Sequence, residues 1–397
     1  IAELALPVIP NNLRNLLIIN DPIEDIKNSI SEIPFDELTE RNKLIWIISS
    51  ENNEINIKKK YPNTFDNKNY KLVVENLSKS NLDNSYKPND NLLDLLKEDR
   101  FLYHLLCKRF SFDESQLITN TLSKKMFLKI IAIRLIPLLT IVFGSLLVLK
   151  TLWGFLASRK IEWKEFKPLN LDLLDMVLLI SGGFVVLGEV ISPLFSITLV
   201  ELVASNLSIE LTQSLKIFFG YLFMAIPPLL IIYYQIKSFE NKFIFKKDYF
   251  QFNFLPIKDS FFQGFKGFLM IIPFVLLVSL IMNLLVDNQN GSNPLLEIVL
   301  NSNNYVSFVL LFLTTTFLAP IFEEVIFRGV LLPVLSREFG IILGITISAF
   351  IFALAHLSIG EMIPLFTLGI GLGTTRLISG RLSSSVIMHS LWNGMTF

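Results

Sequence analysis

Long apolar runs fill the sequence after Lys125, and they constrain the fold more than any other feature. Most approach the roughly 20 residues that an α-helix needs to cross the hydrocarbon core of a bilayer. Lipid offers no hydrogen-bond partners, so only helices or a closed β-barrel can span it, and no run alternates with the period of two typical of barrel strands. The sequence therefore predicts an all-α polytopic membrane protein. We expect about eight transmembrane helices, at residues 135–157, 176–200, 217–236, 267–286, 305–332, 341–357, 362–377 and 382–395.

The composition supports this fold class and excludes several functions. Apolar residues make up 52% of the 397 residues and charged residues only 18%, a balance too apolar for a water-soluble globule. Lysine plus arginine and aspartate plus glutamate each number 35, so no basic excess exists to neutralise a nucleic-acid backbone. We therefore expect no nucleic-acid partner. The single cysteine, Cys107, excludes a disulfide bond or a cluster of metal-binding thiolates within the chain.

The beginning of the chain differs from the rest, because it is rich in Asn, Lys, Asp and Glu and contains no segment that could span a bilayer. We expect residues 1–125 to form a soluble helical N-terminal domain and residues 126–397 to form the transmembrane bundle. A helix is predicted to open at Asp21-Pro22, where an Asp cap and a first-turn Pro are both favourable. Repeated asparagines within residues 62–90 are typical of loops between helices. The partner of this domain is not indicated.

Three short polar stretches interrupt the apolar sequence in its last quarter. Ionisable groups inside a bilayer cost roughly 2.5–3.5 kcal/mol each, so they mark function more often than accident. In a helix, residues four apart share a face, and Glu324 and Arg328 can therefore pair. Glu323 then points about 100° away with no local partner, which suits a general base. The stretches are Glu323-Glu324-Val325-Ile326-Phe327-Arg328, Phe352-Ala353-Leu354-Ala355-His356 and His389-Ser390-Leu391-Trp392-Asn393.

Side chains from three helices can converge on one pocket. His389 and Asn393 are four apart and project from one face of the last span, while His356 projects from the sixth span. Two chemistries remain open for this set. Glu323, His356 and His389 could bind a zinc ion with an open water position. Alternatively, Glu323 and His356 could hold and deprotonate a water while His389 and Asn393 donate hydrogen bonds to the developing oxyanion.

The ordered set of motifs Glu-Glu-x-x-x-Arg, Phe-x-x-x-His and His-x-x-x-Asn resembles the CAAX protease and bacteriocin-processing (CPBP, or Abi) family of intramembrane endopeptidases. The resemblance covers about residues 305–397, a quarter of the chain, and makes them the expected protease-like core. It implies an enzyme that hydrolyses a peptide bond within or next to the bilayer. Members have been described both as metalloproteases and as metal-free, glutamate-dependent enzymes, so a divalent metal such as zinc stays open as a cofactor.

The resemblance also implies a role for each motif residue. Glu323 would be the water-activating carboxylate, with His356 as the partner of that water. Glu324 and Arg328 would be structural partners of Glu323. The remaining implied roles are oxyanion support by His389 and Asn393 and shaping of the pocket by Phe352.

The implied partners are membrane lipid and a peptide or membrane-protein substrate. Prenylated CAAX proteins are substrates of the eukaryotic branch, but nothing in this sequence identifies such a substrate. Its richness in Asn, Lys and Ile is typical of an AT-rich bacterial genome, which favours a bacterial plasma membrane or a photosynthetic membrane. The alternative function is a non-catalytic membrane scaffold or binding protein that keeps the protease fold. A scaffold should tolerate Glu323→Gln, whereas a protease should lose turnover.

Overall fold

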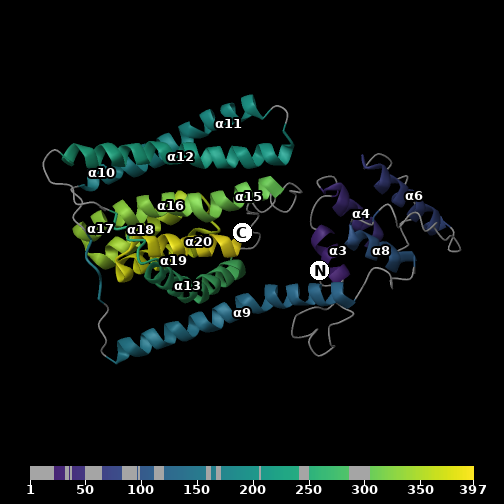
Figure 1. The fold of residues 1–397 in the computed structure, drawn as a ribbon, viewed down its shortest axis with the longest axis horizontal. Helices are drawn as coiled ribbons and strands as arrows, with labels where there is room; N and C mark the ends of the chain where they lie inside the picture. The colour runs from purple at the N-terminus through teal and green to yellow at the C-terminus, as the bar shows by residue number, and fades with distance from the viewer. Residues whose placement is uncertain are drawn as a thin grey trace. The chain divides into compact units, whose positions relative to one another are not determined.

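The structure is a computed structural model, and each regular element that it describes is a helix, as predicted (Figure 1). The chain divides into two compact units, Ile1–Leu139 and Thr140–Phe397. This division lies inside helix α9 (Asn120–Leu156), beyond the composition change at residue 125, because one continuous helix leads from polar into apolar sequence. The described residues are 22–31, 35, 38–49, 65–82, 96, 99–110, 120–157, 162–166, 171–204, 207–240, 250–285 and 305–397.

The first unit is a small helical domain with its own apolar core, which includes the fully buried Leu44, Val73, Leu102 and Leu106. Its helices are α3 (Pro22–Ser31), α4 (Glu40–Ser49), α6 (Lys68–Leu82) and α8 (Arg100–Phe110). The first begins at Pro22, as predicted.

The prediction of loops within residues 62–90 is wrong for α6. Val73, Val74 and Leu77 are buried there, at the three- and four-residue spacing of one helix face. Burial of these side chains outweighs the weak helix preference of asparagine. The other residues from 62 to 64 and from 83 to 90 lie outside the described part of the chain.

Asp99 fixes the start of α8 and ties it to α4. Its carboxylate accepts hydrogen bonds from the N–H groups of Phe101 and Leu102, both at 3.1 Å, and from Arg41 Nε at 2.5 Å. Burial alone would raise the pKa of Asp99, but the hydrogen bonds from Arg41 and Leu102 outweigh it, so the pKa is lowered. Asp99 therefore stabilises this unit as the ionised carboxylate.

Helices occupy all eight predicted positions, the first of them in α9, which runs from the first unit into the second. Six helical stretches of the described chain are long and apolar enough to cross a membrane. Helices α18 and α20 have 15 residues each, so they extend only about 22 Å, less than the roughly 30 Å of a hydrocarbon core. The six stretches are Ser123–Leu156, Leu173–Leu202, Leu211–Lys237, Ile257–Leu285, Tyr305–Phe339 and Met362–Ser379.

The stretch Tyr305–Phe339 is one helical run that changes register twice. Figure 1 shows α15, α16 and α17 following one another. Two π-helical segments separate them, and α16 and α17 each carry a proline, Pro320 and Pro333, in the first turn. Proline has no N–H, so it cannot make the backbone hydrogen bond of a regular helix. The wider π-helical turn before each proline accommodates this missing bond. The elements are α15 (Tyr305–Leu313), η5 (Thr314–Leu318), α16 (Ala319–Glu324), η6 (Val325–Leu331) and α17 (Leu332–Phe339).

The C-terminal helices pack closely around this run. Helix α19 packs against α13 and α18, and α20 packs against α13. The backbones of α18 and α19 approach so closely that a Cβ on Gly369 would lie 2.9 Å from Ala349 Cβ. Glycine at the interface permits this contact, as in other membrane bundles. The bounds are α10 (Leu173–Val177), η4 (Leu178–Ile191), α11 (Ser192–Val203), α12 (Ile209–Glu240), α13 (Ile257–Leu285), α18 (Ile341–Ala355), α19 (Met362–Ser379) and α20 (Leu382–Thr396).

Candidate active site

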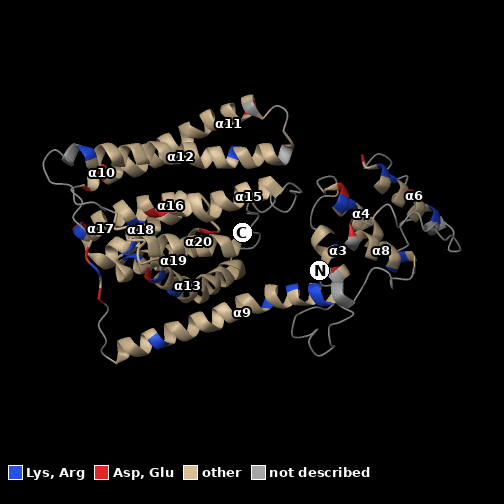
Figure 2. Ribbon diagram, viewed as in Figure 1, with Lys and Arg blue, Asp and Glu red and all other residues tan. Residues whose placement is uncertain are grey.

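Charged side chains are sparse on the helices of the second unit (Figure 2), and several of those present gather around Glu324. Arg328 Nη1 donates to Glu324 Oε1 at 2.8 Å, so the pairing expected from their four-residue spacing is present. His389 Nδ1 lies 3.0 Å from the same oxygen. Ser385 Oγ donates to the other carboxylate oxygen. Glu324 is fully buried, and both of its oxygens are hydrogen-bonded.

Arg328 links this carboxylate to two further helices. Its Nη2 donates to the carbonyl oxygen of Gly369 in α19 at 3.2 Å. Its guanidinium lies over the ring of Phe352 in α18, 4.3 Å from the ring centroid, a distance typical of a cation–π contact. With a side chain only 1% exposed, Arg328 would be costly without these partners. The pair therefore holds together the helices that carry the motif residues.

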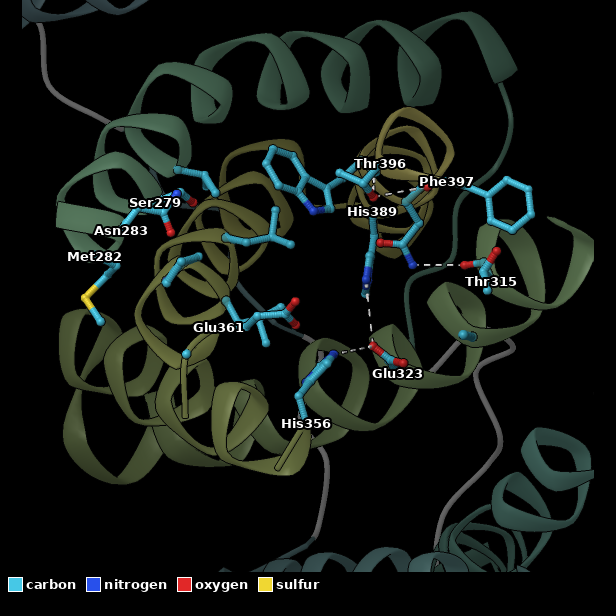
Figure 3. A pocket seen from close by; sticks show the side chains of 18 of the residues that line it. Ser279, Met282, Asn283, Thr315, Glu323, His356, Glu361, His389, Thr396 and Phe397 are labelled. Atoms are coloured by element: carbon cyan, nitrogen blue, oxygen red, sulfur yellow. Dashed lines mark hydrogen bonds and ion pairs between the residues drawn. The ribbon is translucent and has the colours of Figure 1, made fainter. Parts of the chain in front are cut away.

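Glu323 directly precedes Glu324 in the chain, but its carboxylate lacks the hydrogen-bond donors that surround Glu324. Its side chain is 8% exposed, and its Oε2 atom has no hydrogen-bond partner among the described residues. Oε2 lies 3.7 Å from His389 Nε2 and 4.0 Å from His356 Nε2 (Figure 3). The structure thus brings together the carboxylate and two imidazoles that the sequence placed on separate helices.

The hydrogen bonds of the two imidazoles fix which ring nitrogen carries the proton. His356 Nδ1 lies 2.8 Å from the carbonyl oxygen of Phe352, which can only accept. His389 Nδ1 faces the Glu324 carboxylate, which is paired with Arg328 and also accepts. Both histidines therefore carry hydrogen on Nδ1 and, when neutral, present the Nε2 lone pair to Glu323. Three acceptor atoms converge, and a water molecule or a cation would satisfy them.

A cavity of about 460 Å³ opens beside these three atoms. Asn393 also lines it, so the cavity is bounded by all four residues expected to act on the substrate. Phe352 is fully buried and meets both imidazole rings edge-on, at 4.7 Å from His356 and 5.7 Å from His389 between centroids. It therefore fixes the two rings relative to each other.

Asn393 is tied to the irregular helix on the opposite wall. Its Nδ2 donates to the carbonyl oxygen of Thr315 at 2.9 Å. Within η5, the Ala319 N–H bonds to Thr314, five residues back, and the next residue in this register is Pro320, which has no N–H. The backbone N–H that would bond to the Thr315 carbonyl in this i→i−5 pattern is therefore missing, and the side-chain amide of Asn393 donates in its place. The second N–H of the amide and its oxygen remain for the cavity.

Comparison with known families agrees with this geometry. Residues 305–395 match the family described as type II CAAX prenyl endopeptidase Rce1-like. These residues form a CPBP domain. Residues 1–128 match a domain of unknown function (DUF8675). No curated protein and no solved structure matches the chain.

The CPBP domain contains every motif residue, from Glu323 to Asn393. It connects the chain to a family of intramembrane endopeptidases. With six helical stretches of membrane length in its described part, the chain is an integral membrane protein. This agrees with the family resemblance of the three motifs.

Other residues of the site were missed by the sequence reasoning. Ser385 carries no motif signal, although it lies four residues before His389 on the same helix face. Glu361 and Trp392 line the cavity from inside the CPBP domain, and Tyr221 lines it from α12, outside that domain. Glu189 of η4 interacts electrostatically with Glu323 and His356. Only tertiary packing reveals Tyr221 and Glu189, because no local spacing links them to the motifs.

The three convergent atoms, Glu323 Oε2 and Nε2 of His356 and His389, are of the types that bind a divalent metal, but they lie too far apart to hold one as they stand. Two imidazole nitrogens and one carboxylate oxygen form a donor set of catalytic zinc sites. Ligand atoms about 2.0–2.1 Å from a tetrahedral zinc lie roughly 3.3 Å apart, less than the 3.7 and 4.0 Å found here. Among the described residues, no group of His, Cys, Asp and Glu is arranged to hold a metal ion. Zinc binding therefore requires a small contraction of the site.

Proposed function

We propose that the CPBP domain is a CAAX-type intramembrane endopeptidase that hydrolyses a peptide bond with a water molecule activated by Glu323. The observation that carries this proposal is the unpartnered Oε2 of Glu323, buried at a cavity and facing two imidazole lone pairs. A buried carboxylate oxygen left without a donor is costly, so such sites are commonly functional. A scaffold would gain nothing from this arrangement.

In this mechanism a water donates one hydrogen bond to Glu323 and one to His356 Nε2. Glu323 removes a proton as the water oxygen forms a bond to the carbonyl carbon of the substrate. The π electrons of the carbonyl move to its oxygen, which becomes an oxyanion. The proton held by Glu323 then passes to the leaving amide nitrogen as the C–N bond breaks. The electrons of the oxyanion re-form the C=O bond in this step, the products are a carboxylic acid and an amine, and Glu323 returns to its ionised carboxylate form.

Asn393 and His389 stabilise the oxyanion in this proposal. The free N–H of Asn393 is a neutral donor on a wall of the cavity. His389 already uses its Nδ1–H toward Glu324, so its Nε2 can donate only in the imidazolium form. His389 would therefore support the oxyanion only if its imidazolium form is present before the water is activated, because the proton of the water passes to Glu323.

A zinc ion, if the protein binds one, would be held by Glu323, His356 and His389. It would lower the pKa of a bound water and polarise the substrate carbonyl. The roles of Arg328, Ser385 and Phe352 in holding these side chains are the same in either case.

The proposed substrate is a peptide or membrane protein that reaches the cavity from the lipid phase. The match to a prenyl endopeptidase family suggests a lipid-modified chain as one such substrate, and the apolar part of the cavity lining suits it. We place the protein in a bacterial plasma membrane or a photosynthetic membrane, on the basis of the sequence composition.

The test is proteolysis of fluorogenic peptides by the detergent-purified protein. We expect cleavage by the wild type and its loss in both Glu323→Ala and His356→Ala. A chelator is added in parallel, and inhibition that added zinc reverses would assign the reaction to the metal form. Equal cleavage by wild type and both variants would contradict the proposal, since the activity would then be a contaminant.

A further inference from the structure

The charge of the cavity is one-sided. Two carboxylates, Glu323 and Glu361, line it, and Glu189 lies near enough to interact electrostatically with Glu323. Among the described residues that line the cavity there is no lysine or arginine. The nearby Arg328 is already neutralised by Glu324. Apart from its two histidines, the described lining of the cavity therefore offers a substrate acidic groups and no basic ones.

Glu361 lines the cavity but has no part in the proposed reaction. It precedes α19, and its side chain makes no capping hydrogen bond to that helix. It has no hydrogen bond or ion pair with another described side chain, and it interacts electrostatically with His356. Figure 3 shows Glu361 pointing into the cavity, on the side where His356 lies. An exposed carboxylate at a cavity wall is available to a ligand.

The turn between α18 and α19 holds Glu361 in this position. His356 ends α18, and the next residue, Leu357, has a φ of 52°, in the left-handed region that usually favours glycine at the end of a helix. A non-glycine residue in this conformation is uncommon. The turn closes with the Met362 N–H on the Ile359 carbonyl oxygen at 3.4 Å. The chain reverses within five residues, so His356 and Glu361 line the same cavity.

We propose that Glu361 selects substrates with a positively charged side chain, lysine or arginine, next to the scissile bond. This inference rests on the proposed endopeptidase function. The rest of the lining is largely apolar, with Val275, Leu365, Leu368 and Trp392 among its members. The cavity therefore suits an apolar peptide with one cationic side chain.

The experiment compares cleavage of matched peptides by the full chain in detergent. The panel places lysine, glutamine or glutamate at each of three positions on either side of the scissile bond of an apolar peptide. The measured quantity is the ratio of kcat/KM for the lysine peptide to that for the glutamine peptide. We expect a ratio of about ten at the best position, which corresponds to about 1.4 kcal/mol. Since Glu361 is exposed, the ratio should fall as salt screens its charge.

Three variants test whether Glu361 is responsible. Glu361→Gln should bring the ratio to about one, and Glu361→Lys should make the glutamate peptide the better substrate. Glu338→Gln is the matched control, because Glu338 is an exposed glutamate of α17 that pairs with Arg337 and does not line the cavity. This control should keep the ratio of the wild type. A ratio near one in the wild type, or one that Glu361→Gln leaves at ten, would overturn the inference.

Binding separates this inference from the proposed function. Fluorescent lysine and glutamine peptides are titrated against Glu323→Gln, which cannot turn them over if Glu323 is the base. Tighter binding of the lysine peptide supports the role of Glu361 without any cleavage, and equal binding contradicts it. Continued cleavage by Glu323→Gln would overturn the catalytic proposal while leaving the binding comparison valid.

Discussion

Two neighbouring glutamates of one helix lie in regions that differ in almost every respect. Around Glu324, each carboxylate oxygen has a donor, and Ser385 and His389 join α20 to the helical run that carries Glu324 and Arg328. Around Glu323, a buried oxygen has no donor and faces a cavity. The two glutamates thus differ because their neighbouring side chains differ, although the residue type is the same. The contacts of Glu324 hold helices together, whereas Glu323 leaves a buried oxygen facing the cavity, where the proposed reaction would take place.

The strongest test of this contrast is Glu323→Gln. The substitution keeps the shape of the side chain but removes the base, so we expect turnover to fall by about 10²–10⁴-fold. Thermal unfolding of the detergent-purified protein should change little, because Glu323 Oε2 makes no hydrogen bond that could be lost. Retained turnover would favour the scaffold function. Glu338→Gln, on an exposed site, serves as the control for handling and detergent.

Arg328→Met should have the reverse effect and mainly affect stability. Removing the cation leaves the Glu324 carboxylate buried without its main partner, which typically costs 3–5 kcal/mol. Combining it with Glu324→Gln should recover part of the loss, because the remaining group is then neutral. Unfolding of the two single variants and the double variant, measured in the same detergent, gives the coupling energy. Additive effects of the two substitutions would contradict a direct pair.

Asn393 holds the Thr315 carbonyl and also lines the cavity, and Asn393→Leu separates these two roles. The variant should lose roughly 1–2 kcal/mol of stability, because the Thr315 carbonyl loses its donor. Adding Pro320→Ala supplies a backbone N–H to the same helix and should restore stability. Activity should stay about tenfold or more below that of the wild type in both variants if Asn393 also contacts the oxyanion. Recovery of activity together with stability would limit Asn393 to a structural role.

The smallest expected effect is that of Ser385→Ala. Ser385 is fully buried and donates to Glu324, so its loss should cost roughly 1 kcal/mol of stability and leave the kcat of the folded protein nearly unchanged. Ser384→Ala is the matched control. Ser384 is equally buried on the same helix, but its hydroxyl has no partner among the described residues, so the control should be nearly neutral. Equal effects of the two substitutions would show that the Ser385 hydrogen bond adds no stability.

Sequence reasoning predicted the parts of the site that depend on spacing within one helix. The Glu324–Arg328 pair follows from residues four apart, and His389 and Asn393 share a face for the same reason. It could not predict that His389 bridges the two glutamates, with Nδ1 toward Glu324 and Nε2 toward Glu323. That contact joins residues more than sixty positions apart. Its geometry depends on how α20 packs against the run that contains α16.

The same division holds for the fold. Apolar periodicity and length determined the all-α class and located the helices, since lipid leaves a chain no other way to satisfy its backbone. The asparagine-rich α6 was misread, because asparagine disfavours helix locally while burial of Val73 and Leu77 favours it. The short lengths of α18 and α20 and the two changes of register near Pro320 and Pro333 became visible only in the folded chain.

The sequence by itself determined that the protein is a helical membrane protein with a CPBP-type set of motif residues, because hydropathy and four-residue spacing are local properties. Only the tertiary structure decided that Ser385 and His389 complete the hydrogen bonds of Glu324, and that Tyr221, Glu189 and Glu361 lie near Glu323 and its cavity. The physical reason is that hydrogen-bond satisfaction and electrostatic environment depend on neighbours that packing brings together from distant parts of the chain.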